Sequence, residues 1–266
     1  MTTLSRTRRL TTLASASILV ASAAVFGALP AHAAPGGTSG PPAADKVAYA
    51  SLGDSYAAGV GGGDNVLPCL LSPNGYAAQL ASDPGEVHVA LNGCVGATVD
   101  AVVATQLSGL DHRTKFVTLT VGANDLGLAT VTSICLTQGP EACAAAVAGA
   151  EANLPVMAGD LAVALATIRA QAPKATIAVT GYPLLLDPIV PQAPFVNQGV
   201  MALNEVIDGV VTASGPGFVY VDVTDEFLDH GIGSADPWIV APPEPDAFHP
   251  NPAGYAAYAD AIRAVR

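Results

Sequence analysis

The segment Tyr49-Ala-Ser-Leu-Gly-Asp-Ser-Tyr-Ala-Ala-Gly59 contains an apolar run, a polar turn at Gly53-Asp54-Ser55 and a return to small residues. This order predicts a strand, a tight turn and the start of a helix. In α/β folds such turns lie at the carboxyl ends of parallel strands, where ligands bind, and the helix N–H groups there favour negative charge. We therefore expect the Ser55 hydroxyl to face a binding crevice. The alternative is that Asp54 or Ser55 serves only as a helix cap.

The rest of the chain alternates between short apolar runs and helical patterns. Strands are expected at 47–52, 86–91, 116–121, 176–180 and 218–222, and helices at 73–81, 98–107, 144–170 with a break near Pro155, 195–211 and 252–266. Such alternation predicts an α/β fold, a three-layer α/β/α sandwich around a five-stranded parallel sheet with right-handed crossovers. Ser55, Gly93 and Asn124 each follow a strand, so we expect them at one edge of the sheet.

The first 33 residues have the features of a secretory signal peptide. Arg6, Arg8 and Arg9 precede an uncharged run, and Ala31-His-Ala33 provides a small-x-small cleavage site. Arg8-Arg9 would also suit a twin-arginine signal, which leaves the export route open, and a retained membrane anchor is the alternative. Residues 34–45 are rich in Pro, Gly, Ser and Ala and predict a disordered lead-in, followed by one domain at 46–266.

The charge balance limits the partners of the exported chain. The leader contains three of the 10 basic residues and no acidic residue, so 7 basic residues remain against 22 acidic ones. A strongly acidic chain disfavours nucleic acid and anionic membrane surfaces as partners. We expect a secreted, extracellular monomer without stable membrane insertion.

All four cysteines, Cys69, Cys94, Cys135 and Cys143, lie in the exported part of the chain. An even count in an oxidising compartment predicts disulfides. Three pairings are possible, and we favour the two local closures, Cys69 with Cys94 and Cys135 with Cys143. A zinc site is the alternative, but no CxxC or HxxxH spacing supports it.

A serine nucleophile needs a base, and the exported chain offers four histidines. His88 lies in a predicted strand, His112 in a charged turn and His230 in a loop near Trp238. His249 is placed best, in Asp246-Ala-Phe-His-Pro-Asn-Pro252 directly before the last helix. The Asp246 carboxylate could accept a hydrogen bond from His249 Nδ1 and leave Nε2 for Ser55; the alternative is a simple turn motif.

The developing oxyanion needs fixed hydrogen-bond donors. We expect these to be the backbone N–H of Ser55, the backbone N–H of Gly93 and the side-chain amide of Asn124. Gly93 and Asn124 can also close the turns after their strands, and the two roles are compatible.

Four sequence blocks in order carry a family resemblance: Gly53-Asp-Ser-Tyr56, Gly93, Gly122-Ala-Asn-Asp125 and Asp246-x-x-His249. Together they resemble the signature of the SGNH (GDSL-type) hydrolases, serine esterases and lipases with a flavodoxin-like sheet. Gly181-Tyr-Pro183 and the segment 230–238 are similar to the secreted lipases and esterases of actinobacteria. Those commonly hold three disulfides, whereas this chain has cysteines for two. Some members orient the histidine with a backbone carbonyl instead of the acid.

The resemblance implies a carboxylic-ester hydrolase that needs no metal and no organic cofactor. Ser55 would form an acyl-enzyme, His249 would carry the proton and Asp246 would orient His249. The substrate would be a small-molecule ester or lipid, and a carbohydrate deacetylase or phospholipase fits the same residues. Two other classes stay open: a non-catalytic binding protein, and a metal-dependent hydrolase that uses Asp54, Asp125, Asp246 and His249.

Overall fold

Five short parallel strands form the centre of the domain. The structure, a computed structural model, describes residues 48–85 and 88–266, so the predicted signal peptide and lead-in lie outside the described residues. The strands β1 (Tyr49–Gly53), β2 (Val89–Leu91), β3 (Phe116–Thr120), β4 (Thr176–Thr180) and β5 (Phe218–Val221) lie in the order β2-β1-β3-β4-β5, and every neighbouring pair is parallel. This order reverses direction between β1 and β3, which is where open α/β sheets bind their ligands.

The central strands are buried on both faces, which explains their continuous apolar sequences. Every residue of β1 and β3 is buried. Parallel strands covered by helices on both sides read as uninterrupted apolar runs, because no side faces water. Thr120, a polar exception in β3, is hydrogen-bonded on both sides: its hydroxyl lies 2.7 Å from that of Tyr76 and 2.6 Å from that of Thr180.

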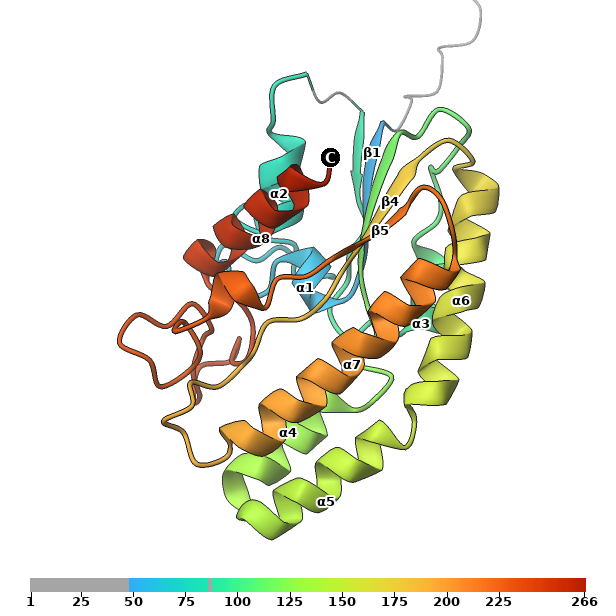
Figure 1. Cartoon of the computed structure of the whole chain (residues 1–266). Coiled ribbons are helices and arrows are strands. Elements are labelled where there is room, and N and C mark those ends of the chain that lie inside the picture. The colour runs from blue at the N-terminus through green and yellow to red at the C-terminus, as the bar shows by residue number, and fades with distance from the viewer. Residues whose placement is uncertain (1–47, 86–87) are drawn as a thin grey trace, which may run out of the picture. The chain divides into compact units, whose positions relative to one another are not determined.

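Helices cover both faces of the sheet and give the predicted three layers (Figure 1). The layer on one face contains α2 (Tyr76–Ala81) and α8 (Pro252–Ala264), which pack against each other. The other layer contains α3 (Val99–Thr105), α6 (Leu154–Gln171) and α7 (Ala193–Ala213). The three-layer α/β/α sandwich is therefore confirmed.

Two elements had no counterpart among the predicted ones, the helix α4 (Leu128–Thr137) and the 3₁₀ turn η1 (Asp225–Phe227). The helix start predicted after the turn at Gly53-Asp54-Ser55 is the one-turn helix α1 (Ser55–Ala58). α4 is short and rich in β-branched residues, and it begins after Gly127 without a capping side chain, so it lacks the usual sequence signals of a helix. It continues into α5 (Pro140–Glu151), which packs on α7.

Within the described part of the chain, no single helix is both long and apolar enough to cross a membrane. Only α5 and α6 taken together reach that length and composition, and they are bent by 41° relative to each other.

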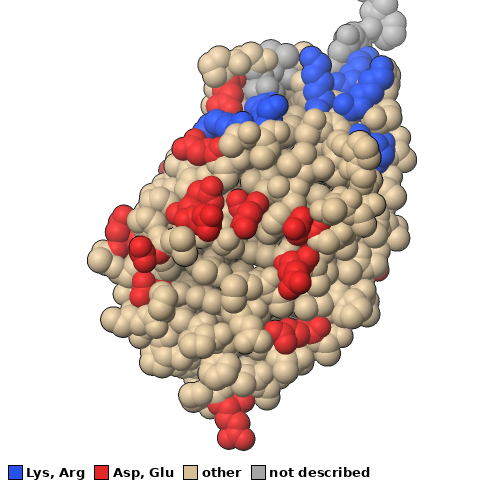
Figure 2. Space-filling view, viewed as in Figure 1, with Lys and Arg blue, Asp and Glu red and all other residues tan. Residues whose placement is uncertain are grey.

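The basic residues gather at the amino-terminal end of the sheet. Figure 2 shows the Lys and Arg side chains close together at one end of the visible face, while Asp and Glu side chains spread over the remainder. Lys115 directly precedes β3, and Arg169 donates to the carbonyl oxygens of Ala175 and Gly217, which precede β4 and β5, at 2.7 and 3.0 Å. Arg266 lies over the ring of Phe116 at the start of β3.

Candidate active site

The turn after β1 is fixed by its contacts with β3. The N–H of Asp54 donates to the carbonyl of Thr120 at 2.9 Å. Gly53 has a φ of 129°, and a Cβ there would lie 2.0 Å from the same carbonyl oxygen, so only glycine fits. The Asp54 carboxylate accepts the N–H of Tyr56 at 2.9 Å and the hydroxyl of Tyr182 at 2.6 Å. Asp54 thus caps α1 from below, and Ser55 becomes its first residue.

Ser55 and His249 meet although 194 residues separate them. The Ser55 hydroxyl oxygen lies 2.8 Å from His249 Nε2, and Ser55 is 8% exposed. The loop that carries the histidine is anchored by Tyr56, whose hydroxyl donates to the carbonyl of Phe248 at 2.6 Å. Asn251 then caps α8 by accepting the N–H groups of Ala253 and Gly254.

The predicted hydrogen bond from His249 Nδ1 to the Asp246 carboxylate is not present in this structure. Nδ1 of His249 instead lies 3.1 Å from two backbone carbonyl oxygens, those of Asp246 and Ala247. The intervening Phe248 has a φ of 69°, and this tight turn brings the carbonyls to the ring. The Asp246 side chain turns away and accepts Asn65 Nδ2 at 3.2 Å. Asp246 therefore contacts the histidine through its main chain.

Burial sets the protonation state of the histidine. Loss of hydration lowers the pKa of His249 below its usual range, and the two carbonyl acceptors oppose this shift only in part. A lowered pKa keeps the imidazole neutral near neutral pH. With a proton on Nδ1 facing the carbonyls, Nε2 is free to accept the Ser55 proton.

A cleft of about 300 Å³ opens in front of these two residues. Its lining is mostly apolar, with Val95, Leu128, Ala129 and Phe248 beside Ser55, Asn124 and His249. Asn124 donates one amide hydrogen to the carbonyl of Ala97 at 2.9 Å, which fixes the side chain and leaves its second hydrogen for a ligand.

The glycine that reaches the cleft is Gly96 and not Gly93. Gly93 is buried against α1, where a Cβ would lie 2.7 Å from the Ala57 carbonyl carbon and the Ala58 nitrogen. Gly96 lines the cleft, and no described acceptor bonds to its N–H or to that of Ser55. Gly93 therefore does not lie in the cleft as expected but lets the loop approach α1, and Gly96, three residues later, lines the cleft.

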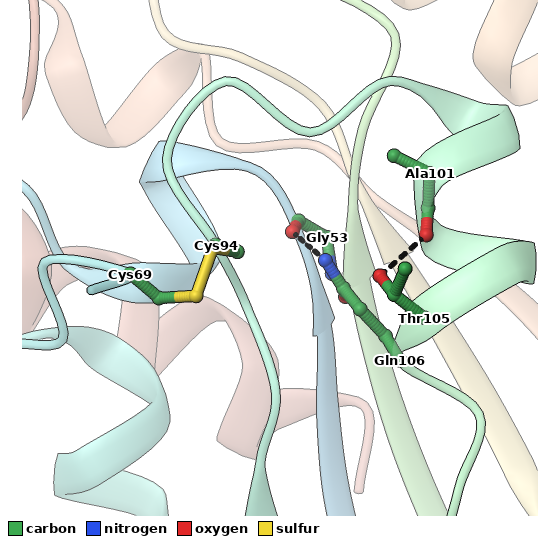
Figure 3. Close-up of a disulfide and its surroundings, with 6 residues drawn as sticks. All are labelled: Gly53, Cys69, Cys94, Ala101, Thr105 and Gln106. Atoms are coloured by element: carbon green, nitrogen blue, oxygen red, sulfur yellow. Dashed lines mark hydrogen bonds between the residues drawn. A yellow bond between two sulfur atoms is a disulfide. The ribbon is translucent and has the colours of Figure 1, made fainter. Parts of the chain in front are cut away.

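Two disulfides join Cys69 to Cys94 and Cys135 to Cys143, the two local closures. The first holds the loop before Gly96. Close to it, the Gln106 side chain accepts the Gly53 N–H at 2.7 Å and donates to the Gly53 carbonyl at 2.8 Å (Figure 3). Gln106, Tyr56 and Tyr182 support the nucleophile turn. Tyr56 and Tyr182 lie in blocks that carried the family resemblance, but their supporting contacts were not predicted, and nothing in its local sequence singled out Gln106.

The other candidate residues lie outside this group. The ring of His230 stacks on Trp238 with 3.5 Å between centroids. Asp125 accepts the N–H of Val99 at the start of α3, and burial raises the pKa of its carboxyl. Among the described residues, no set of three or more His, Cys, Asp or Glu side chains is placed to hold a metal ion. Asp54, Asp125 and Asp246 each face a different hydrogen-bond partner instead.

Comparison with known proteins identifies the family. Residues 51–257 match the GDSL-like Lipase/Acylhydrolase family. The chain belongs to this family. It is 31% identical to a lipase of Streptomyces rimosus over 94% of this chain and 95% of that protein, and 30% identical to Lipase 1 of Streptomyces coelicolor over 92% and 94%.

Solved structures agree with this assignment. The GDSL-like hydrolase described here superposes on an extracellular lipase of Streptomyces rimosus with a TM-score of 0.78 at 28% identity, covering 83% of this chain and all of the other. For phospholipase A1 of Streptomyces albidoflavus the TM-score is 0.77 at 30% identity, with 83% and 99% covered. The predicted resemblance to SGNH hydrolases is confirmed, and the chain is an ester-hydrolysing enzyme of this family.

Proposed function

We propose that this GDSL-like hydrolase cleaves carboxylic esters through an acyl-enzyme formed on Ser55. The observation that carries the proposal is the 2.8 Å contact between the Ser55 hydroxyl and His249 Nε2, at the floor of an apolar cleft. A serine hydroxyl becomes nucleophilic only when a base takes its proton, and a neutral imidazole within hydrogen-bond distance is such a base.

The reaction follows from the positions of these groups. Ser55 Oγ attacks the acyl carbon while His249 Nε2 takes its proton, and the carbonyls of Asp246 and Ala247 stabilise the imidazolium through Nδ1–H. The N–H groups of Ser55 and Gly96 and the amide of Asn124 donate to the oxyanion. His249 then gives its proton to the leaving alcohol, and a water molecule releases the acid by the reverse sequence.

Export of the enzyme is part of the proposal. The two disulfides and the likeness to an extracellular lipase support secretion after cleavage behind Ala33. We propose that the secreted enzyme acts as a monomer on a small-molecule ester or lipid.

An apolar cleft favours an acyl chain over a sugar, because its exposed lining is mostly apolar and offers a carbohydrate few hydrogen-bonding groups. The polar side chains that line it are Asp54, Ser55, Tyr56, Asn124, Thr132 and His249. Phospholipid esters are the second candidate, supported by the likeness to a phospholipase A1 at 30% identity.

The test is hydrolysis of p-nitrophenyl esters from acetyl to palmitoyl by the mature enzyme and by Ser55→Ala. We expect kcat to fall by about 10⁴-fold or more in the variant, since the nucleophile is lost. The circular dichroism spectra of both proteins should coincide, as the control for folding. Equal rates in both would exclude Ser55 as the nucleophile.

A further inference from the structure

The catalytic cleft and the cationic residues lie at opposite ends of the molecule. Ser55, Asn124 and His249 gather beyond the carboxyl ends of β1 and β3. All Lys and Arg residues in the described part of the chain lie at the other end of the sheet: Arg113, Lys115, Arg169, Lys174, Arg263 and Arg266. A five-residue strand is about 16 Å long, and charges in water are screened beyond about 8 Å at physiological salt. These cations therefore cannot balance a negative charge in the cleft.

The described Arg residues are also held at that end by their own contacts. Arg263 pairs with Asp83 at 2.9 Å, and Arg113 pairs with Asp111. Arg169 is held by backbone carbonyls, as described above. A rearrangement of these side chains alone would not bring a cation to the cleft.

The surroundings of the cleft are acidic or apolar. Apart from His249, the ionisable side chains among the described residues that line it are Asp54, which lies buried beneath Ser55, and Tyr56, whose hydroxyl donates to the Phe248 carbonyl. Neither of them is a cation. Two further acidic residues are chain neighbours of residues that line the cleft: Asp246 directly precedes Ala247, and Asp125 directly follows Asn124. An anionic group that enters the cleft would lose hydration and gain no Lys or Arg partner from residues 48–85 and 88–266, which is unfavourable.

We propose that the cleft selects esters whose acyl chain is uncharged and rejects acyl chains that carry a carboxylate, a substrate preference that rests on the proposed function. The same arrangement favours release of the product, because hydrolysis converts a neutral ester into a carboxylate. The distribution of charge thus distinguishes substrate from product at the same site.

The experiment compares two esters with the same six-carbon acyl chain. One is p-nitrophenyl hexanoate, and the other is the p-nitrophenyl monoester of adipic acid, in which a carboxylate replaces the terminal methyl group. We expect kcat/KM to be at least about tenfold higher for the hexanoate at an ionic strength of about 0.01 M. The ratio should decrease at about 1 M salt, where acidic residues outside the cleft are screened, and should stay above one because dehydration of the carboxylate is not screened.

Two variants make the inference specific. Val95 lines the cleft and is 40% exposed, so Val95→Lys places a cation at its edge, and Val95→Met is the control of similar length without charge. Val95→Lys should lower the hexanoate-to-adipate ratio by about fivefold or more, the effect of one opposite charge about 4 Å away in water. Val95→Met should leave the ratio near that of the wild type, and so should Lys115→Gln at the far end.

The outcomes separate this inference from the proposed function. Similar kcat/KM values for both esters in the wild type, or an unchanged ratio in Val95→Lys, would overturn the charge preference while leaving the serine mechanism in place. Hydrolysis of neither ester, with wild type equal to Ser55→Ala, would contradict the proposed function and the charge preference together.

Discussion

At the scale of single residues, His249 is held by main-chain carbonyls, and this determines what a mutation of Asp246 should do. Asp246→Asn keeps the backbone carbonyl that lies 3.1 Å from Nδ1 and removes only a side-chain charge that faces Asn65. We expect kcat/KM for p-nitrophenyl butyrate to fall by less than about tenfold. His249→Ala removes the base itself and should cost about 10³-fold or more.

The comparison of these two variants decides which group orients the base. Where a carboxylate orients a catalytic histidine, its loss costs about 10⁴-fold in kcat. A loss of that size in Asp246→Asn would show that the carboxylate swings towards Nδ1 during the reaction.

Asn124 is positioned by one hydrogen bond so that its other amide hydrogen remains available. The bond to the Ala97 carbonyl at 2.9 Å fixes the side chain before a substrate arrives. Asn124→Ala should therefore lower kcat by about 10²–10³-fold with a smaller change in KM, because the lost interaction develops in the transition state. Steady-state kinetics with p-nitrophenyl butyrate measures both constants. A rise in KM at constant kcat would instead assign Asn124 to ground-state binding.

At the scale of elements, the loop between β2 and α3 approaches α1 closely at Gly93. Gly93→Ala would push a methyl group to 2.7 Å from the α1 backbone and displace the helix that carries Ser55. We expect the free energy of unfolding to fall by about 1–3 kcal/mol, and kcat to fall with it. Urea denaturation of the purified variant measures this stability.

Gly96→Ala is the matched control, since no atom lies within 4 Å of its Cβ position. Its φ of 76° should cost only about 1 kcal/mol. Equal losses of stability in the two variants would contradict the close packing of Gly93 on α1.

Some elements were predictable from sequence because their signals are local. The five strands are short apolar runs that end in polar turns, and α8 begins with a proline after a capping Asn251. The Ser55–His249 pair could also be proposed, since Ser55 follows the first strand and His249 lies in an Asp-x-x-His motif directly before the last helix. The helix α4 could not be predicted, because it is stabilised by packing and by a disulfide instead of by its own sequence. The strand order followed only from the resemblance to a flavodoxin-like sheet, and the observed order β2-β1-β3-β4-β5 agrees with it.

The errors at the site have a common physical cause. Which of Gly93 and Gly96 lines the cleft depends on the path that the Cys69–Cys94 disulfide and the contact with α1 impose on the loop. The spacing of residues along the chain does not reveal this path. Likewise, the Asp-x-x-His spacing permits a hydrogen bond between the two side chains. The positive φ of Phe248 instead places backbone carbonyl oxygens next to Nδ1 of His249.

At the scale of the whole molecule, a buried carboxyl beneath the nucleophile links stability to pH. Burial raises the pKa of Asp54 to about 7, although the Tyr182 hydroxyl and the N–H groups of Tyr56 and Ala57 partly stabilise its charge. In the unfolded chain the pKa returns to about 3.9. Between about pH 4 and pH 7 the native state therefore binds more protons than the unfolded state, so this group lowers stability as the pH rises.

Asp54→Asn should abolish this contribution, because an amide does not ionise while its oxygen can still accept the Tyr56 N–H that caps α1. The slope due to Asp54 is at most about 1.4 kcal/mol per pH unit between its two pKa values. We expect the difference in free energy of unfolding, variant minus wild type, to be more positive at pH 8 than at pH 5. An altered contact with Tyr182 would shift both values equally. Urea denaturation at the two pH values measures this difference, and parallel pH profiles for the two proteins would mean that Asp54 stays ionised in the folded enzyme across this range.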